Sequence, residues 1–403
     1  MNYENSAEFV KKMDADDPLA KYRGQFHIPQ HNGQDCIYFC GNSLGLQPVT
    51  AAPAIQQELE DWKNLGVEGH FKGKNPWKDY HEFLTEQLAH VVGAKPVEVV
   101  AMNNLTVNLH LLMASFYRPT KERHKIIIEQ SAFPSDQYAV KSQIAFHGFD
   151  PATSLIELKT GEDIEPLIDE SVALILIGGV NYYTGELFDL EKITRLGHAK
   201  GCIVGFDLAH AAGNALLKLH DWSVDFAAWC SYKYLNGGPG AVAGAFVHER
   251  FANDHTLPRF AGWWGHDKKS RFKMGPDFKP IAGAEGWQLS NPSIFGLAPL
   301  RASLNMFYEA KMENLRAKSE ALTGYLAFLL AGKAELMTPA DPARRGCQLS
   351  IRAKSKKVFD ALTEGGVVCD WREPDCVRVA PVPFYNTFSD VYRFAKIFTE
   401  VPL

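Results

Sequence analysis

Two stretches decide the fold: residues 202–210 read CIVGFDLAH, and residues 229–240 read WCSYKYLNGGPG. In each, a short apolar run ends close to a polar side chain, Asp207 in the first and Lys233 in the second. Such runs are typical of buried strands in a parallel sheet. Ligands bind at the carboxyl ends of these strands. We therefore expect both side chains to reach a ligand crevice.

Each residue alone has a plainer explanation. Asp207 would cap a following helix, and Lys233 would be a surface lysine on a loop. Taken together, they lie 26 residues apart (233 − 207 = 26), each at the end of a strand. This arrangement suits pyridoxal phosphate, because a lysine forms an imine with its aldehyde and an aspartate keeps its ring nitrogen protonated. Burial favours the role of the lysine, since desolvation lowers the pKa of an amine.

Strand-like and helix-like segments alternate around these stretches. Residues 133–146 and 190–200 predict helices, and short apolar runs predict strands at 125–129, 173–177, 202–206, 224–230 and 242–247. This alternation indicates βαβ units and a mostly parallel sheet that is covered on both faces. Residues 299–332 predict one long helical region, and a smaller α+β segment follows. We expect a segment 1–60 that packs with the small domain, a large α/β domain 61–298 and a small α+β domain 299–403.

Two further segments offer partners for a phosphate and an aromatic ring. NNLTVN (103–108) opens a predicted helix, and a helix N-terminus beside the Thr106 hydroxyl suits a phosphate. AFPSDQY (132–138) follows the predicted strand 125–129 and places Phe133 where its ring would stack on a pyridine. Ser135 and Asp136 would cap the next helix. Alone, either segment would be an ordinary helix start.

Composition limits the class of protein. The chain has 403 residues, 46% of them hydrophobic and 22% charged, and a formal net charge of −5, which excludes wholesale disorder and argues against nucleic-acid binding. Its seven cysteines are scattered without the spacing of a zinc site, so we expect no metal and a reduced, cytoplasmic chain. No apolar run approaches the roughly 20 residues that span a bilayer. We expect no membrane partner and see no signal peptide.

Nine fragments of the chain resemble the kynureninase family. They occur in the family's order from near the N-terminus to near the C-terminus: GNSLGLQP (41–48), NLTVN (104–108), FPSD (133–136), YYTGE (182–186), GFDLAHAAGN (205–214), DWSVDFAAWCSYKYLNGGPG (221–240), GWWGH (262–266), LSNPSIF (289–295) and RVAPVPFYN (378–386). The resemblance implies the aspartate-aminotransferase fold, fold type I of the pyridoxal-phosphate enzymes. This is an α/β fold with a mostly parallel seven-stranded sheet and a smaller C-terminal α+β domain. It also implies a homodimer with active sites at the interface.

The activity that the resemblance implies is a hydrolase reaction on a carbon–carbon bond. Water would cleave the Cβ–Cγ bond of L-kynurenine or of 3-hydroxy-L-kynurenine. The products would be L-alanine and anthranilate or 3-hydroxyanthranilate. Such a reaction belongs to tryptophan degradation and NAD biosynthesis.

The resemblance also assigns roles to residues. Lys233, Asp207 and Tyr232 would be catalytic: Lys233 binds the cofactor aldehyde, Asp207 contacts the ring nitrogen beside His210, and Tyr232 donates a proton to Cβ. The other cofactor contacts would be Leu105, Thr106, Phe133, Pro134, Ser135, Asp136 and Gly178, with Trp263 and Asn291 contributed by the partner subunit. The substrate would meet Arg378 at its α-carboxylate, and Ser43, His70, Ser290 and Asn291 around its aromatic ring.

Two positions bear on this assignment. Gly178 lies where some members carry a serine, so one hydroxyl donor is missing there. Neighbours on an extended strand point to opposite faces. Tyr232 and Lys233 can therefore share a site only if the strand has already ended.

Other interpretations use the same cofactor. A cysteine desulfurase or an aminotransferase has the same fold, and a non-catalytic protein could hold pyridoxal phosphate without turnover. A desulfurase needs a mobile catalytic cysteine in a loop. Cys347 and Cys369 lie in or beside predicted strands of the small domain, which is a poor place for that task.

Overall fold

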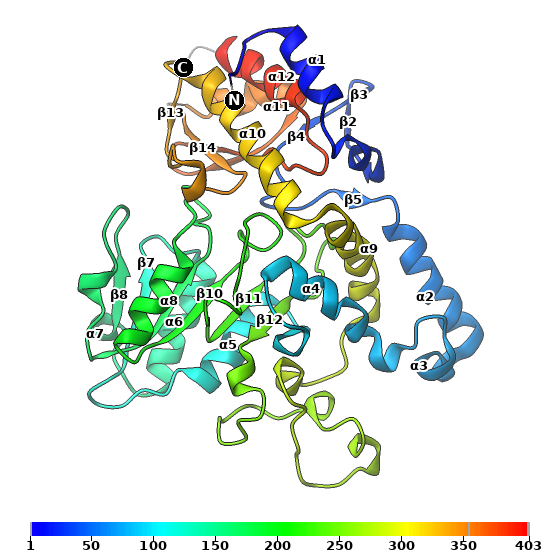
Figure 1. Ribbon diagram of the computed structural model, residues 1–403, viewed down its shortest axis with the longest axis vertical. Helices are drawn as coiled ribbons and strands as arrows, with labels where there is room; N and C mark the ends of the chain where they lie inside the picture. The colour runs from blue at the N-terminus through cyan, green and yellow to red at the C-terminus, as the bar shows by residue number, and fades with distance from the viewer. Residues whose placement is uncertain (1, 354, 401–403) are drawn as a thin grey trace.

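The computed structural model describes residues 2–353 and 355–400, and it places a smaller domain on one side of a larger α/β domain (Figure 1). The large domain is built on a seven-stranded sheet with the strand order β6-β12-β11-β10-β9-β7-β8. The strands are β6 (Val99–Ala101), β7 (Lys125–Glu129), β8 (Leu155–Leu158), β9 (Val172–Gly178), β10 (Ile203–Asp207), β11 (Phe226–Trp229) and β12 (Gly244–Val247).

The sheet is mostly parallel, as predicted. Strands β7 to β11 pair in parallel, whereas β12 runs antiparallel to both of its neighbours, β11 and β6. A parallel pair needs a long crossover, usually through a helix, but an antiparallel pair can be joined directly. The chain accordingly turns back from β11 to β12 through residues 230–243, the loop that carries Lys233.

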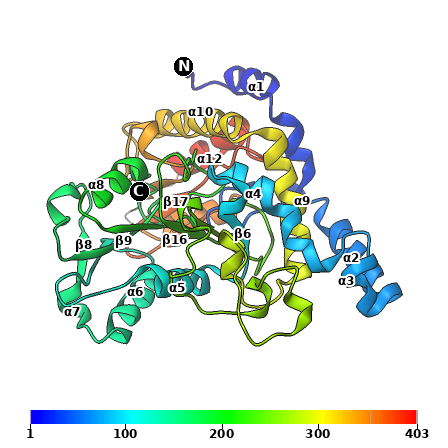
Figure 2. The same cartoon turned by 60° about the horizontal axis from the view of Figure 1, so that its bottom comes forward.

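Both faces of the sheet are buried because successive side chains of each strand point to opposite sides. Ile126 and Ile128 of β7 belong to the core under α5 (Leu105–Phe116) and α6 (Pro134–Phe146). Ile127 belongs to the core on the other face, with residues of α4 (Thr85–Val92) and α8 (Leu190–Ala199). Figure 2 shows α5 and α6 on one side of the strands and α8 on the other. This arrangement leaves the carboxyl ends of the parallel strands as the place for a ligand.

The long helical region predicted over 299–332 consists of two separate helices in the structure. They are α9 (Ile294–Ala310) and α10 (Met312–Leu330), and between them Lys311 has a φ of 65°. This left-handed conformation is uncommon for a residue with a side chain and cannot continue a helix. α9 packs on α2 (Ala51–Leu65) and α4, whereas α10 packs on α12 (Phe388–Glu400). The boundary expected at 298/299 therefore falls inside α9.

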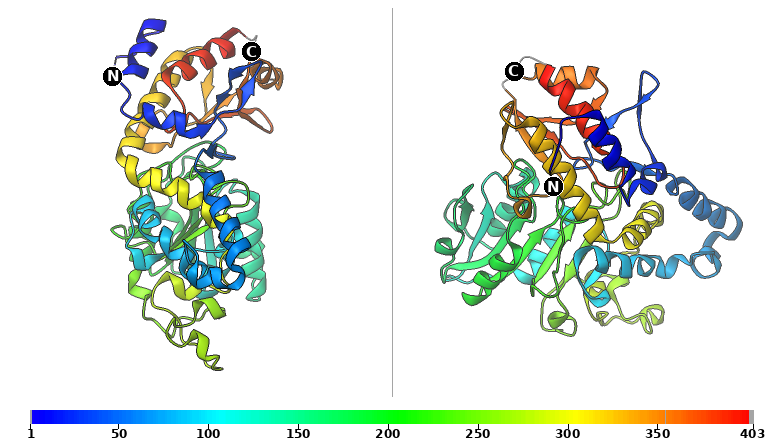
Figure 3. Two further views of the ribbon diagram at one scale, coloured as in Figure 1. Left: turned by 90° about the vertical axis from the view of Figure 1, so that its right-hand side faces the viewer. Right: turned by 45° about the horizontal axis from the view of Figure 1, so that its top comes forward.

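The small domain contains a four-stranded antiparallel sheet in the order β13-β14-β17-β16. Its strands are β13 (Glu335–Leu336), β14 (Leu349–Arg352), β16 (Asp370–Arg372) and β17 (Cys376–Val379), and α11 (Lys357–Glu364) lies beside α12. The N-terminal segment joins this domain: α1 (Ala7–Ala15) packs on α12, and β4 (Ile37–Tyr38) pairs with β15 (Val367–Val368) (Figure 3). Val10 and Phe39 enter its core.

The remaining regular elements are short. They are α3 (Gly69–Lys72), α7 (Pro151–Ser154), the paired strands β1 (Phe26–His27) and β5 (Gln47–Pro48), the hairpin of β2 (Gln30–His31) and β3 (Gln34–Asp35), and short segments of 3₁₀ helix, of which the longest is Trp77–Leu84. Among the described residues, none of the helices has the length and apolar character that crossing a bilayer requires.

Candidate active site

A cavity of about 420 Å³ opens at the carboxyl ends of β7, β9 and β10, beside the loop that follows β11. Segments far apart in the sequence meet here because neighbouring parallel strands end at the same edge of the sheet. Residues predicted to contact the cofactor line this cavity: Leu105, Thr106, Phe133, Ser135, Asp136, Gly178, Asp207, His210, Tyr232 and Lys233. Pro134 is the first residue of α6 at the same edge.

Lys233 points into the cavity and pairs with a neutral histidine. Strand β11 ends at Trp229, so Tyr232 and Lys233 lie in the following loop and both line the cavity. Lys233 Nζ lies 2.9 Å from His210 Nε2 and 5.9 Å from the centroids of the Phe133 and Tyr232 rings. Burial, followed by the charge of Lys233, lowers the pKa of His210 well below its usual value. His210 is therefore neutral at pH 7, and the Lys233 amine donates the hydrogen bond.

Three buried carboxyl groups form the opposite wall. Asp207 ends β10, and its Oδ1 accepts a hydrogen bond of 2.7 Å from the Ala209 amide. Residues 209–213 form turns, so Asp207 does not cap an α-helix. Asp136 of α6 interacts with Asp207, and Glu129 ends β7. Burial raises the pKa of all three carboxyl groups.

Two helix N-termini converge on one end of the cavity. α5 begins after Asn104 and α6 after Phe133, and neither of these side chains caps its own helix. Thr106 Oγ1 and Ser135 Oγ, in the two first turns, lie 2.7 Å apart. The first N–H groups of a helix lack intrahelical acceptors and carry a partial positive charge, so they suit a phosphate.

The donor set fits pyridoxal phosphate. An amine, buried carboxyls, an aromatic ring and two helix N-termini share one cavity of about the right size. Asp136 Oδ1 and His210 Nδ1 are buried without a hydrogen-bond partner among the described residues, so the wall offers polar atoms that a polar heterocycle can satisfy. The Gly178 amide is already used, because it donates to Glu129 Oε2 at 3.0 Å.

Arg378 lies in the small domain and is held by residues on both sides of it. Its Nε donates to Asp370 Oδ1 at 2.6 Å, and its Nη2 contacts Asp370 Oδ2 and, at 3.3 Å, Ser43 Oγ. Its Nη1 donates to the Tyr182 carbonyl at 2.6 Å. Burial alone would raise the pKa of Asp370, but the bound guanidinium lowers it below the usual value.

Ser43 and Asp370 both contact the guanidinium of Arg378. Ser43 was expected near the aromatic ring of the substrate, and the structure places its hydroxyl in a 2.6 Å hydrogen bond to Asp370 Oδ2, beside Arg378. Sequence reasoning did not identify Asp370. The available signal was its place eight residues before Arg378, on the other strand of a short hairpin.

The YYTGE motif connects the two domains. Three consecutive carbonyls of this motif accept hydrogen bonds from small-domain side chains. Arg378 and Gln348 donate to Tyr182, Ser350 donates to Tyr183, and Thr338 donates to Thr184. The Tyr182 ring meets the Phe133 ring edge-on, with centroids 5.3 Å apart, and lines the cavity. One loop thus contacts both Phe133 and Arg378.

Seven predicted residues do not line the cavity of this chain. Pro134 lies between two lining residues, and Arg378, which contacts Ser43, donates to the carbonyl of the lining residue Tyr182. The other four are His70, Trp263, Ser290 and Asn291. Trp263 is 45% exposed, and Ser290 and Asn291 are exposed just before α9. His70, in α3, packs against Trp77 with ring centroids 5.3 Å apart. A single chain therefore does not bring these residues to Lys233.

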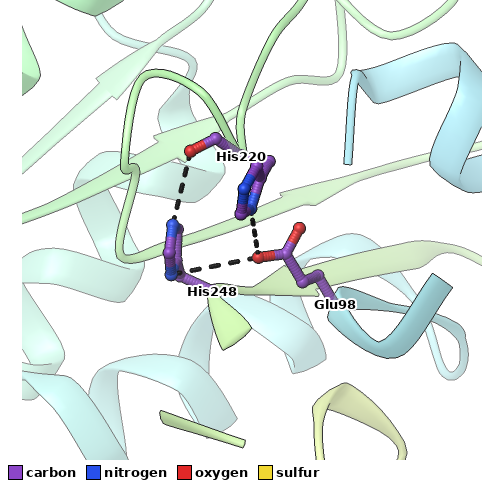
Figure 4. A group of neighbouring side chains, drawn as sticks. All are labelled: Glu98, His220 and His248. Carbon is purple, nitrogen blue, oxygen red and sulfur yellow. Dashed lines mark hydrogen bonds and ion pairs between the residues drawn. The ribbon is translucent and has the colours of Figure 1, made fainter. Parts of the chain in front are cut away.

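A second polar cluster, formed by Glu98, His220 and His248, lies apart from this cavity (Figure 4). The two imidazole rings are stacked, 15° from parallel with centroids 5.1 Å apart, so their in-plane lone pairs do not converge on one point. The Glu98 carboxylate already accepts hydrogen bonds from the Lys95 and Glu249 amides and from His220 Nδ1. The cluster is explained as a structural anchor of three chain segments rather than as a metal centre.

Comparison with known proteins agrees with this geometry. The family described as "Kynureninase C-terminal domain" matches residues 315–398, and the DegT/DnrJ/EryC1/StrS aminotransferase family matches residues 76–220. The kynureninase of Koribacter versatilis is 61% identical over 414 residues, covering 98% of each chain. That of Myxococcus xanthus is 57% identical over 412 residues, covering 98% of this chain and 97% of the relative.

Solved structures share the fold at low identity. The cystine lyase C-DES, with glycine linked to its pyridoxal-phosphate cofactor, has a TM-score of 0.78 at 15% identity and covers 91% of this chain and 97% of its own. The cysteine desulfurase CsdA from Escherichia coli has a TM-score of 0.77 at 18% identity and covers 94% of this chain and 97% of its own. The fold is therefore that of the fold type I pyridoxal-phosphate enzymes, as the sequence predicts. With full-length relatives above 50% identity, the chain belongs to the kynureninase family.

Proposed function

We propose that the chain uses pyridoxal phosphate to hydrolyse the Cβ–Cγ bond of L-kynurenine or 3-hydroxy-L-kynurenine. The products are L-alanine and anthranilate or 3-hydroxyanthranilate. This activity places the protein in tryptophan degradation and NAD biosynthesis, in the cytoplasm. The observation that carries the proposal is the cavity that joins Lys233 to a buried carboxyl wall and to two helix N-termini, in a chain of this family.

Three groups of residues would hold the cofactor. Thr106, Ser135 and the N-termini of α5 and α6 would bind its phosphate, with Leu105 beside them and Tyr232 nearby. Phe133 would stack on its ring, and Asp207 would bind the ring nitrogen. When bound, the cofactor supplies an electron sink for a carbanion at the substrate Cα.

The protein's own groups move the protons. Lys233 would bind the cofactor aldehyde through its amine, and the same amine would remove the proton from the substrate Cα. Neutral His210, 2.9 Å from Lys233 Nζ, accepts a hydrogen bond from that amine and orients it. Burial raises the pKa of Tyr232, so its phenol stays protonated and is available to donate a proton to Cβ. Positioned acid–base groups of this kind typically contribute about 10²–10⁴-fold each.

Arg378 binds the α-carboxylate of the substrate. Asp370 engages the Nε and Nη2 side of the guanidinium, and Nη1 and Nη2 also donate to the Tyr182 carbonyl and Ser43 Oγ. The substrate carboxylate would therefore meet the Nη1–Nη2 edge by replacing the long contact of 3.3 Å to Ser43. A planar guanidinium binds a carboxylate through paired N–H groups, which a lysine cannot do.

The functional unit is a homodimer. His70, Trp263, Ser290 and Asn291 lie outside the cavity of their own chain, so they act on the site of a second copy. The chain also carries exposed apolar side chains on α2, α3 and the segment 260–295, including Trp62, Phe71, Phe272 and Met274. The Phe272 ring meets both Phe71 and Trp263, with centroids 6.4 and 5.4 Å away, which joins this surface to a predicted site residue. Such a patch is typical of a subunit interface.

The decisive test is turnover by the purified, cofactor-loaded protein. We expect anthranilate and alanine in equal amounts from L-kynurenine, and little sulfide or alanine from L-cysteine. Comparing kcat/KM on kynurenine with that on 3-hydroxykynurenine identifies the preferred substrate. Desulfuration of cysteine without kynurenine cleavage would favour the desulfurase alternative, although Cys347 and Cys369 are both buried. Cofactor binding with no turnover of any amino acid would favour a non-catalytic role.

A further inference from the structure

Glu129 is a buried carboxyl group in the cavity wall to which the proposed reaction gives no task. It is the last residue of β7, is 6% exposed and lines the cavity. On the neighbouring strand β9, Gly178 donates its amide to Glu129 Oε2, and on the next strand Asp207 pairs in register with Gly178. Glu129 and Asp207 thus end two strands that flank β9 on opposite sides.

The absence of a side chain at Gly178 makes room for this carboxyl group. A Cβ atom built at Gly178 would lie 2.7 Å from Glu129 Oε1, closer than such atoms come in real structures. A residue with a side chain at position 178 would therefore move the Glu129 carboxyl.

The charges around Glu129 do not balance if every group is ionised. The carboxyl groups of Asp136 and Asp207 interact with it, and Lys233 is the cation that acts on these two aspartates. Three negative charges against one positive charge are costly in a dry site, so some of the acids keep their protons. Burial raises the pKa of Glu129 to about 7, although the hydrogen bond from the Gly178 amide opposes this effect, and the charge of Asp207 makes a smaller contribution that also raises the pKa.

We propose that Glu129 is a positioning residue of the cofactor site, which acts through Asp136 and Asp207 and sets the negative charge that the cofactor ring nitrogen meets. This inference rests on the proposed contact between Asp207 and that nitrogen. Protonated Glu129 leaves the carboxyl wall with one charge fewer. Ionised Glu129 adds a charge that strengthens the hold on a protonated ring nitrogen.

The test compares the cofactor-loaded wild type with Glu129→Gln. Glutamine keeps an oxygen for the Gly178 amide but cannot ionise. Visible absorbance of the bound cofactor is followed from pH 5.5 to 8.5 without substrate. We expect a spectral step in the neutral range for the wild type and its loss in Glu129→Gln. The matched control is Glu157→Gln, on the neighbouring strand β8 but exposed to solvent, which keeps the step.

Cofactor affinity gives a second readout. Pyridoxal phosphate is titrated into the apoprotein of the wild type and of Glu129→Gln at pH 6 and pH 8.5. At each pH, the dissociation constant of Glu129→Gln is divided by that of the wild type. This ratio cancels the effect of protonation of the cofactor phosphate, which is the same for both proteins. We expect this ratio to rise about fivefold at the higher pH, as one added charge would give. Superimposable spectra together with a pH-independent ratio would overturn the proposal.

Gly178→Ala keeps every ionisable group and decides the question should Glu129→Gln not fold. Its methyl group displaces the Glu129 carboxyl, so the midpoint of the spectral step is expected to move. An unchanged midpoint would contradict the proposal. These experiments contain no substrate, so a negative result would contradict the role of Glu129 without bearing on kynurenine cleavage. Conversely, an enzyme that shows the spectral step but does not cleave kynurenine would contradict the proposed reaction and not the role of Glu129.

Discussion

Asp370 and Arg378 face each other directly across the antiparallel pair of β16 and β17. The carboxylate meets the guanidinium through two nitrogens, with Nε 2.6 Å from Oδ1. Ser43 bridges the pair, since its hydroxyl donates to Asp370 and accepts from Arg378. The plane of the guanidinium is therefore fixed before any substrate arrives, which lowers the entropic cost of binding a carboxylate.

Removing the charge of Asp370 tests this positioning. In Asp370→Asn, we expect KM for kynurenine to rise about 10-fold while kcat changes much less, because a hydrogen bond to a charged group contributes about 1.5–3 kcal/mol. Asp375→Asn is the control, since Asp375 lies in the same hairpin but pairs with Arg352. A lower KM in Asp370→Asn would show that Asp370 competes with the substrate instead.

Arg378→Lys tests the carboxylate contact itself. A lysine is a point charge and cannot hold Asp370, the Tyr182 carbonyl and a substrate carboxylate at defined angles. We expect KM to rise by about 100-fold, as loss of a paired ionic contact of nearly 3 kcal/mol would give. Initial rates over a range of kynurenine concentrations measure it, and an unchanged KM would mean that another residue binds the carboxylate.

Lys233→Ala removes the amine that we propose binds the cofactor aldehyde. We expect loss of the visible absorbance that depends on this covalent bond and loss of nearly all turnover. The absorbance spectrum and an anthranilate assay are measured on the same sample. Wild-type turnover in this variant would refute the role of Lys233.

Glu98→Gln probes the anchor drawn in Figure 4. The Glu98 carboxylate is fully buried and accepts three N–H groups, and an amide would place an NH₂ group against one of these donors. We expect the free energy of unfolding to fall by about 1–3 kcal/mol, with normal kcat/KM for the folded enzyme. Chemical denaturation measures the loss, and Glu249→Gln, a substitution of an exposed neighbour, serves as control. Equal stability of the two variants would contradict the anchoring role.

Glu285 gives the protein a pH-dependent stability. Burial would raise the pKa of Glu285, but His81 and Lys268 outweigh burial and lower it to about 2. A carboxyl whose pKa is lower in the folded state stabilises the fold above its unfolded pKa and loses this contribution as the pH falls. We expect the stability advantage of wild type over Glu285→Gln to be full at pH 6.5 and to shrink progressively below about pH 4.5. Denaturation series at several pH values measure it, and a constant difference would contradict this assignment.

The sequence predicts the parallel part of the fold because burial on both faces leaves uniform apolar runs. It does not predict that β12 runs antiparallel, since an apolar run carries no mark of direction. It also misses the change of direction at Lys311, because the apolar pattern continues through both helices while one residue adopts a left-handed conformation.

The same contrast applies to the site. Asp207 and Lys233 are recognisable because each follows a strand-like run, and the structure brings both to one cavity. No sequence pattern singles out Glu129, because its proposed role depends on the absence of a side chain at Gly178, which lies on another strand. Asp370 becomes meaningful only through the register of β16 with β17. Pairings between strands are set by tertiary packing, which a single sequence does not reveal.

Three consecutive carbonyls, of Tyr182, Tyr183 and Thr184, fasten the large domain to side chains of the small one. Lys233 belongs to the first domain and Arg378 to the second, so the groups proposed to meet the amino and carboxylate substituents of one substrate Cα come from two separate cores. A change in the angle between the domains would therefore turn Cα relative to the cofactor, whatever the length of the substrate side chain. Substitutions at Thr338 and Ser350, which lie outside the cavity, should alter this orientation.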